Sequence, residues 1–275
     1  MAVESVTETA MIWGTVSGAS MLGMVISLLL SVGLPIFLGI FIYKKTKAWV
    51  PAFFIGCGIF VGFAMILEQI CHAIVLTVTG DVIRDNIWLY AIYGGLAAAL
   101  FEECGRWIAM KFCLKKHLTR ENALMYGAGH GGIEAFLILG MSSMSNLLTA
   151  AMINGGLMEK TMTALEPAQQ EVTYHQLSVL WTTPAYQFYL APVERISAIA
   201  LQIALSILVY SAVKTGRKLH LAAAFGLHFA VDFLTVICAA AIPTWALELG
   251  LLLVVAVICV VVYQLVYVQM AEKKA

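Results

Sequence analysis

Carboxylate, histidine and arginine side chains interrupt five otherwise apolar segments of this sequence. In chain order they are Glu68 with His72, Glu102 and Glu103 with Arg106, His130 with Glu134, Glu194 with Arg195, and His228 with Asp232. An ionisable group placed in hydrocarbon costs at least about 2.5–3.5 kcal/mol. So many of them are expected to face one another around a hydrated cavity, where carboxylates and imidazoles could hold a water molecule or a metal ion.

The spacing of these residues places them on common helix faces. Four positions separate Glu102 from Arg106, His130 from Glu134, and His228 from Asp232. Residues at that interval share one face of a helix. Each pair can therefore point into the same cavity.

Glu102 and Glu103 have a structural alternative, which is an ion pair with Arg106 or Arg195. One carboxylate suffices to balance one arginine, and adjacent residues of a helix point about 100° apart. We therefore expect different roles, with one glutamate meeting a catalytic water and the other holding an arginine. For Glu194 beside Arg195 the simpler interpretation is a structural charge pair that supports the site.

His130 and His228 also have a structural alternative. Each could be a hydrogen-bonded imidazole in the helix-bundle core, without any role in chemistry. His130 and His228 are each followed, one helical turn later, by a carboxylate. That repetition favours a function for both.

The elements that must position these residues are membrane-spanning helices. Hydrophobic residues make up 61% of the 275 residues and charged residues 12%, about half of the charged fraction usual in soluble domains, and the mean hydropathy is +0.91. Runs longer than about 18 apolar residues predict helices that cross the bilayer. We predict an all-α polytopic bundle around a polar cavity, built as one membrane domain over 1–275. Its seven spans are expected near 17–43, 51–78, 87–114, 122–153, 184–213, 219–240 and 244–268, with an outer polar loop over 154–183.

Basic residues predict the orientation. With the N-terminus outside, twelve Lys and Arg residues fall at the inner side, whereas the outer loops hold Arg84 and Lys160 alone. Positive charge accumulates on the cytoplasmic side of membrane proteins. We expect an integral protein of the bacterial plasma membrane with its N-terminus outside and its C-terminus in the cytoplasm.

Depth within the membrane brings the candidate residues into one layer. At about 1.5 Å per residue, Glu102 and Glu134 each lie roughly 18 Å from the inner ends of their helices. By the same rise, His228 and Asp232 lie roughly 13 and 20 Å from the inner end of theirs. These four residues are predicted to meet near the middle of the bilayer.

The glycines around His130 favour close helix packing. Gly127, Gly129 and Gly132 match the spacing G-x-G-x-x-G, but an apolar helix surrounds them and no strand precedes them. Glycine lets helix backbones approach each other in membranes. The six cysteines contain no C-x-x-C pair and are interpreted as buried thiols, and no basic surface suggests nucleic acid.

Three motifs carry a resemblance to a known group of enzymes. EECGR at 102–106, GHGGIEA at 129–135 and HFAVD at 228–232 resemble the motifs of the glutamate-dependent intramembrane proteases. That superfamily contains the CAAX prenyl endopeptidase and bacteriocin-processing (CPBP) enzymes and the PrsW proteases, and within it the chain resembles the YhfC family of intramembrane metalloproteases. The resemblance runs from about the second span to the end.

The resemblance implies roles for particular residues. Glu102, with Glu103 in support, corresponds to the first motif, Glu134 to the acidic or histidine position of the second, and His228 with Asp232 to the last. His130 stands where relatives usually carry an aromatic residue, which favours a metal site. Arg106 follows the glutamate pair at the spacing of the PrsW proteases.

The hypothesis is peptide-bond hydrolysis inside the membrane. A water held by Glu102 and Glu134 would attack a membrane-embedded protein or peptide, with lipid as the surrounding partner. A divalent metal such as zinc would be held by His130, Glu134, His228 and Asp232; otherwise no cofactor is expected. Without a metal, His228 could donate to the developing oxyanion.

Two rivals remain. A proton- or cation-coupled transporter would use the carboxylates as a relay, although the chain shows no inverted repeat. A scaffold without activity would use them to specify helix pairing.

Overall fold

The fold is a bundle of long helices. The computed structural model describes residues 11–272, which contain no strand. Seven helices are long and apolar enough to cross a membrane, namely Gly18–Thr46, Pro51–Thr79, Ile87–Cys113, Arg120–Asn154, Ala185–Thr215, Lys218–Ala239 and Thr244–Val268. Their ends lie within three residues of the predicted ones, because hydrophobic runs and polar breaks mark them directly. The predicted polytopic all-α bundle is confirmed.

Several spans change their helical type along their length. The second consists of α2 (Pro51–Phe60), the π-helical η1 (Val61–Glu68) and α3 (Gln69–Thr79), and the fourth of α6 (Arg120–Ala135), η4 (Phe136–Gly140) and α7 (Met141–Asn154). The third is α5 (Ile87–Ile108) with η2 (Ala109–Cys113), and the last is α12 (Thr244–Val262) with η5 (Tyr263–Val268) and α13 (Gln269–Glu272). The remaining spans are α1 (Gly18–Thr46), α10 (Ala185–Thr215) and α11 (Lys218–Ala239), and the short connecting helices are α4 (Asp81–Arg84) and η3 (Lys115–His117). Wide turns of this kind recur beside functional residues, and η4 begins two residues after Glu134.

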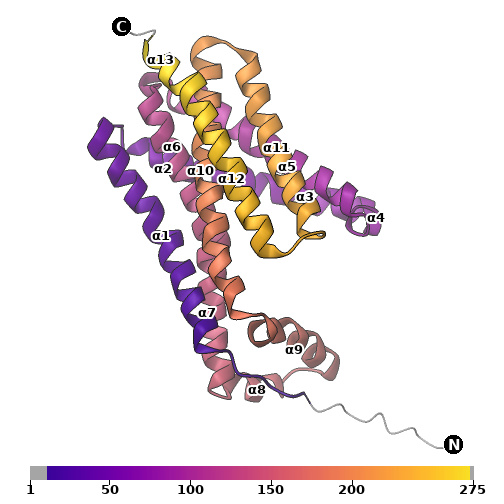
Figure 1. Ribbon diagram of the computed structural model, residues 1–275. Helices are drawn as coiled ribbons and strands as arrows, with labels where there is room; N and C mark the ends of the chain where they lie inside the picture. The colour runs from indigo at the N-terminus through magenta and orange to yellow at the C-terminus, as the bar shows by residue number, and fades with distance from the viewer. Residues whose placement is uncertain (1–10, 273–275) are drawn as a thin grey trace, which may run out of the picture.

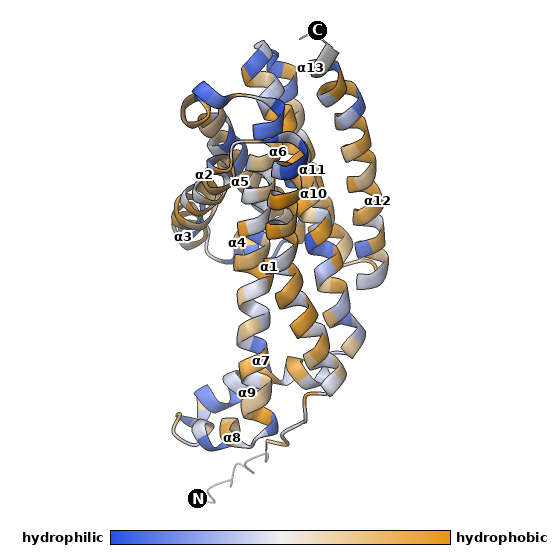
Figure 2. Ribbon diagram, turned by 90° about the vertical axis from the view of Figure 1, so that its left-hand side faces the viewer, coloured by the Kyte–Doolittle hydropathy of each residue, from blue (hydrophilic) through white to orange (hydrophobic). Residues whose placement is uncertain are grey.

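The polar connection after the fourth span is more ordered than a loop. The segment 154–183 holds α8 (Leu157–Met162) and α9 (Pro167–Thr182). Pro167 suits the first turn of α9 because its fixed φ is helical and its missing N–H would be unpaired there anyway. Figure 2 shows more hydrophilic residues around α8 and α9 than along α1 and α12.

The centre of the bundle is α10, the most buried of the seven spans. Figure 1 shows α1 and α12 running along the bundle on either side of α10, whereas α2, α3 and α5 run across it. Helix α1 begins at the end that carries α8 and α9, and α13 lies at the other end. The C-terminal part of α5 meets the middle of α10, where Glu102 and Arg106 contact Gln202.

Glycines set the position of α6 against its neighbours. A Cβ on Gly129 would lie 1.9 Å from the carbonyl oxygen of Phe53 in α2, and one on Gly127 would lie 2.7 Å from the Cα of Ile203 in α10. On the third side, a Cβ on Gly132 would lie 2.5 Å from the Cβ of Pro35 in α1. The prediction that these glycines serve close packing is confirmed, and a dinucleotide-binding loop is excluded by their place inside a helix.

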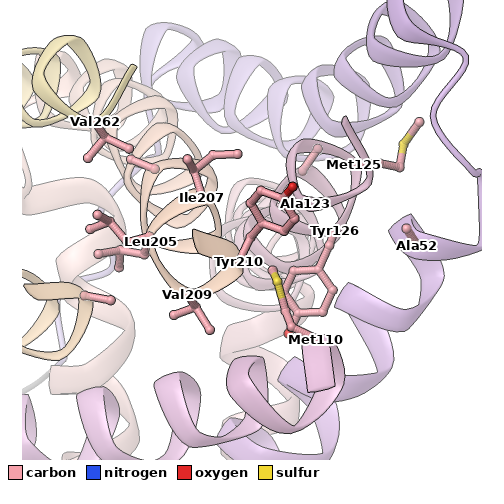
Figure 3. Packing of buried hydrophobic residues seen from close by; sticks show 14 of the residues in the cluster. Ala52, Met110, Ala123, Met125, Tyr126, Leu205, Ile207, Val209, Tyr210 and Val262 are labelled. Carbon is pink, nitrogen blue, oxygen red and sulfur yellow. The ribbon is translucent and has the colours of Figure 1, made fainter. Parts of the chain in front are cut away.

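A hydrophobic core fills the part of the bundle nearest α13. Figure 3 shows Met110, Tyr126 and Tyr210 packed together there. All six cysteines are free. The expectation that they are buried is wrong: Cys104 and Cys113 are exposed and the other four half-buried, because apolar side chains of a membrane helix can face lipid as well as core.

Candidate active site

A cavity of about 310 Å³ lies between α5, α6, α10, α11 and α12. Its polar wall consists of Glu102, Glu134, Glu194, Arg195, Gln202, His228 and Asp232. Its apolar wall includes Ile138, Leu251 and Val255. Glu102, Glu134, His228 and Asp232, the four residues placed in one layer by their depth, therefore line a common space, whereas Glu103, Arg106 and His130 do not line it.

Glu102 is the centre of the polar wall. Its Oε2 atom lies 2.9 Å from Nε2 of His130 and accepts a hydrogen bond of 2.9 Å from Nε2 of Gln202. Nε2 of His228 lies 3.9 Å from the same oxygen, and so does Nη2 of Arg106. One carboxylate oxygen thus faces two imidazoles from two different helices.

Glu103 points away from the cavity and supports the residues behind it. Nη1 of Arg106 donates to both of its oxygens, at 2.8 and 3.1 Å. Oε1 also lies 2.8 Å from Nδ1 of His228. Adjacent glutamates therefore have different partners, as expected from their 100° offset.

The contact with Glu103 favours one tautomer of the His228 imidazole. A carboxylate accepts a hydrogen bond, so Nδ1 of His228 carries the proton and donates it. In the neutral imidazole, Nε2 then has a free lone pair toward Glu102 and Asp232. A carboxylate behind a histidine in this way is the usual support of a metal-binding imidazole.

Glu134 is held by Arg195 and by Gln202, whose amide nitrogen also binds Glu102. Arg195 donates from Nη1 to Oε1 of Glu134 at 3.1 Å, and Gln202 donates from Nε2 to Oε2 at 2.8 Å. The remaining nitrogens of Arg195 bind both oxygens of Glu194. Arg195 therefore bridges Glu134 of α6 and Glu194 of α10. The two contacts with Glu194 fix the orientation of its guanidinium group.

Gln202 is a residue of the site that the sequence analysis did not find. Its amide nitrogen binds Glu102 and Glu134, and its Oε1 accepts from Nη2 of Arg106. It lies seven residues after Arg195 in the same apolar span. An amide two turns from a charged residue on one helix face was the signal that could have revealed it.

The predicted metal ligands divide into two groups. His130 and His228 face Glu102, and Asp232 lies 3.5 Å from Nε2 of His228 with about a third of its side chain exposed. Glu134 instead has Arg195 and Gln202 as its partners. Within residues 11–272, no three or more His, Cys, Asp or Glu side chains form a preassembled metal site.

The donor types nevertheless fit zinc. Two imidazoles and a carboxylate form a common catalytic zinc set, with bonds of about 2.0–2.1 Å that put ligand atoms about 3.3 Å apart. The distances from Oε2 of Glu102 to the two imidazole Nε2 atoms, 2.9 and 3.9 Å, lie on either side of that separation. By donor type, Glu102, His130 and His228 are therefore the residues that would hold the ion.

Two further buried carboxylates lie outside this polar wall. Glu68 pairs with His72 at 3.2 Å, and Nδ1 of His72 lies 2.8 Å from the hydroxyl of Tyr93. Glu248 in α12 is buried, and its Oε2 has no hydrogen-bond partner among the described residues. Neither glutamate lines the cavity.

Comparisons with known proteins identify the family. A family model described as "YhfC intramembrane metalloprotease" matches residues 30–261. The uncharacterized membrane protein YhfC of Bacillus subtilis (strain 168) is 43% identical over 204 residues, which is 71% of this chain and 76% of the relative. No solved structure matches the chain. With most of its length matched by the family model, and with a similar membrane protein over nearly as much, the chain belongs to the YhfC family.

Proposed function

We propose that this protein is an intramembrane protease that hydrolyses a peptide bond of a membrane-embedded protein or peptide. The observation that carries the proposal is the meeting of Glu102 with His130 and His228 at the wall of a cavity that also holds Glu134. The family's description as a metalloprotease supports it. The apolar wall suits a substrate that enters from lipid.

Hydrolysis would use Glu134, one of the carboxylates that line the cavity, as the general base. Glu134 takes a proton from the attacking water, whose oxygen bonds to the scissile carbonyl carbon. The same proton goes to the leaving nitrogen as the carbon–nitrogen bond breaks, so the products are a carboxylic acid and an amine. Arg195 and Gln202 orient Glu134 throughout.

Glu102, His130 and His228 are the residues that would hold a divalent metal such as zinc. A bound zinc would supply an activated water and a Lewis acid for the carbonyl. Glu103 supports this arrangement by fixing the orientation of His228. In a metal-free reaction, a protonated His228 would instead donate from Nε2 to the developing oxyanion.

A wider relationship follows from the same residues. We also propose that the chain is related to the glutamate-dependent intramembrane proteases; the supporting observation is that its three motifs lie on α5, α6 and α11 and that Glu102, His130 and His228 approach one another. Glu102, His130 and His228 represent one motif each. This contact supports the proposal that the three motifs act together as one functional unit.

Conservative variants test the proposal. We expect Glu102→Gln and Glu134→Gln to lower cleavage of membrane peptides by at least about 100-fold, because the first removes a carboxylate that would hold the metal and the second removes the base that takes the proton from the water. Glu121→Gln is the control, since Glu121 pairs with Arg120 at 2.8 Å and does not line the cavity. Mass spectrometry of membrane peptides, with melting curves in detergent, provides the measurement.

The outcomes separate the competing functions. Equal cleavage by wild type and both site variants would remove the protease site. Ion flux without cleavage products would indicate the transporter, and loss of folding in both glutamine variants would indicate the scaffold. If cleavage persists in the presence of a chelator and the purified protein contains no metal, the metal has no role in the reaction. The proposed role of the glutamates would then still stand.

A further inference from the structure

A second cavity lies at the opposite end of the bundle from α8 and α9. It has a volume of about 170 Å³ and lies between the ends of α10, α11 and η5 with α13. Its polar lining comes from Ser211, Lys214, Thr215, Arg217, His220 and Gln269. None of the described residues that line it carries a carboxylate, so its basic groups are not neutralised from within.

The local backbone adds to the positive character of this cavity. Helix α10 ends at Gly216, whose positive φ of 74° allows the chain to turn directly into α11. Arg217 caps α11 without a side-chain hydrogen bond to the first backbone N–H groups. Backbone N–H groups at a helix start attract anions, although the N–H of His220 already donates to the carbonyl oxygen of Arg217 at 3.1 Å.

A hydrogen bond also prepares one side chain for a ligand. Nδ1 of His220 lies 2.7 Å from the hydroxyl of the buried Ser211. This contact holds the imidazole at the cavity wall. Nε2 of His220 is left as a further polar group for an anion.

The other wall of the cavity is apolar and continues onto the surface that faces lipid. Leu265, Val266 and Met270 form it. Leu265 is 59% exposed. A ligand with an anionic head and a hydrocarbon chain matches both walls, whereas a free anion matches the basic wall alone.

We propose that this cavity binds the phosphate headgroup of an anionic phospholipid, with an acyl chain along Leu265. Basic pockets between membrane helices are suited to anionic headgroups. By the distribution of lysines and arginines, this is the cytoplasmic end of the protein. The site is independent of the proteolytic cavity and of the proposed hydrolysis.

A charge-matched pair of double variants tests the site. The purified full-length protein would be titrated with phosphatidylglycerol and, separately, phosphatidylcholine, and bound lipid measured by native mass spectrometry. Lys214→Gln/Arg217→Gln should weaken phosphatidylglycerol binding about 30-fold, at about 1 kcal/mol for each basic residue. Lys44→Gln/Lys45→Gln removes the same charge at the end of α1 and should leave this binding unchanged.

Two further arms identify the source of the anion. Leu265→Ser should weaken phosphatidylglycerol binding without creating any affinity for phosphatidylcholine. Inorganic phosphate that displaced the lipid at equal concentration would overturn the lipid assignment. Equal losses in both double variants, or none in the Lys214/Arg217 variant with an unchanged melting curve, would overturn the site itself.

Discussion

Arg106 connects most of the buried charges of the candidate active site. It has no exposed surface, binds both oxygens of Glu103, reaches Gln202, and lies 3.9 Å from Glu102. A buried ion pair contributes little beyond a hydrophobic replacement, but removal of one partner leaves an unpaired charge. Arg106 is therefore a structural requirement for the two glutamates rather than a participant in the chemistry.

The loss of Arg106 should destabilise the protein strongly. We expect Arg106→Met to lower the free energy of unfolding by about 3–5 kcal/mol, because Glu103 is left buried without its cation. Unfolding in mixed micelles measures this change.

The matched control is Arg84→Met. Arg84 pairs with Asp81 at 3.8 Å, and both side chains are more than half exposed. Its loss should change stability by less than about 1 kcal/mol. Similar effects of the two variants would show that Arg106 is solvated and not part of a buried network.

Helix α6 shows how a sequence of small residues fixes the shape of the site. Gly127, Gly129 and Gly132 face three different helices, so α6 is enclosed by α10, α2 and α1. This close packing brings His130, between the glycines, within 2.9 Å of Glu102. A wider separation of the helices would place the imidazole out of reach of the carboxylate.

A single methyl group tests this packing. Gly129→Ala would place a Cβ 1.9 Å from the backbone oxygen of Phe53, which has little freedom to move. We expect a loss of stability of at least about 1–3 kcal/mol, together with a loss of cleavage, because α6 must move away from α2. Melting temperature and activity are measured together.

Gly94→Ala in α5 is the control for helix propensity. A Cβ there has no neighbour within 4 Å. Alanine stabilises a helix interior by about 0.5–1 kcal/mol relative to glycine. A Gly129→Ala protein as stable as the Gly94→Ala protein would contradict the enclosed position of α6.

At the scale of the whole molecule, residues 11–272 hold seven candidate spans, an odd number, so the first and the last of them have their outer ends on opposite sides of the bundle. Helix α1 begins near α8 and α9, and α13 lies at the other end (Figure 1). We propose that the end with α8 and α9 is outside the cell, because lysines and arginines gather at the other end. The basic cavity at the end of α10 would then face the cytoplasmic leaflet.

Labelling of introduced cysteines tests this orientation. In a chain whose six native cysteines are replaced, Lys160→Cys in α8 should react with an impermeant maleimide in intact cells. Lys44→Cys and Lys116→Cys should react only after the membrane is opened, because their loops are inside. The reverse pattern would overturn the orientation and move the lipid site to the outer leaflet.

The sequence by itself determined the class of the fold and singled out most of the polar residues that line the candidate cavity. Spans follow from hydropathy because lipid accepts only long apolar helices with satisfied backbones, and residues such as Glu102, His130 and His228 are conspicuous because charge in hydrocarbon is costly. Helical periodicity then related Glu134 to His130 and Asp232 to His228. The glycine packing of α6 was also predictable, since small residues have few other uses in such a helix.

Only the tertiary structure decided which partners these residues have. Periodicity orders residues on one helix, but the rotation and crossing angle of two helices depend on side-chain packing along their whole contact. For this reason the sequence could not predict that Arg106 pairs with Glu103. Nor could it predict that Gln202 bridges Glu102 and Glu134, or that a basic cavity lies at the end of α10. The helices α8 and α9 were missed because they have the polar composition of a loop and depend on contacts with the bundle.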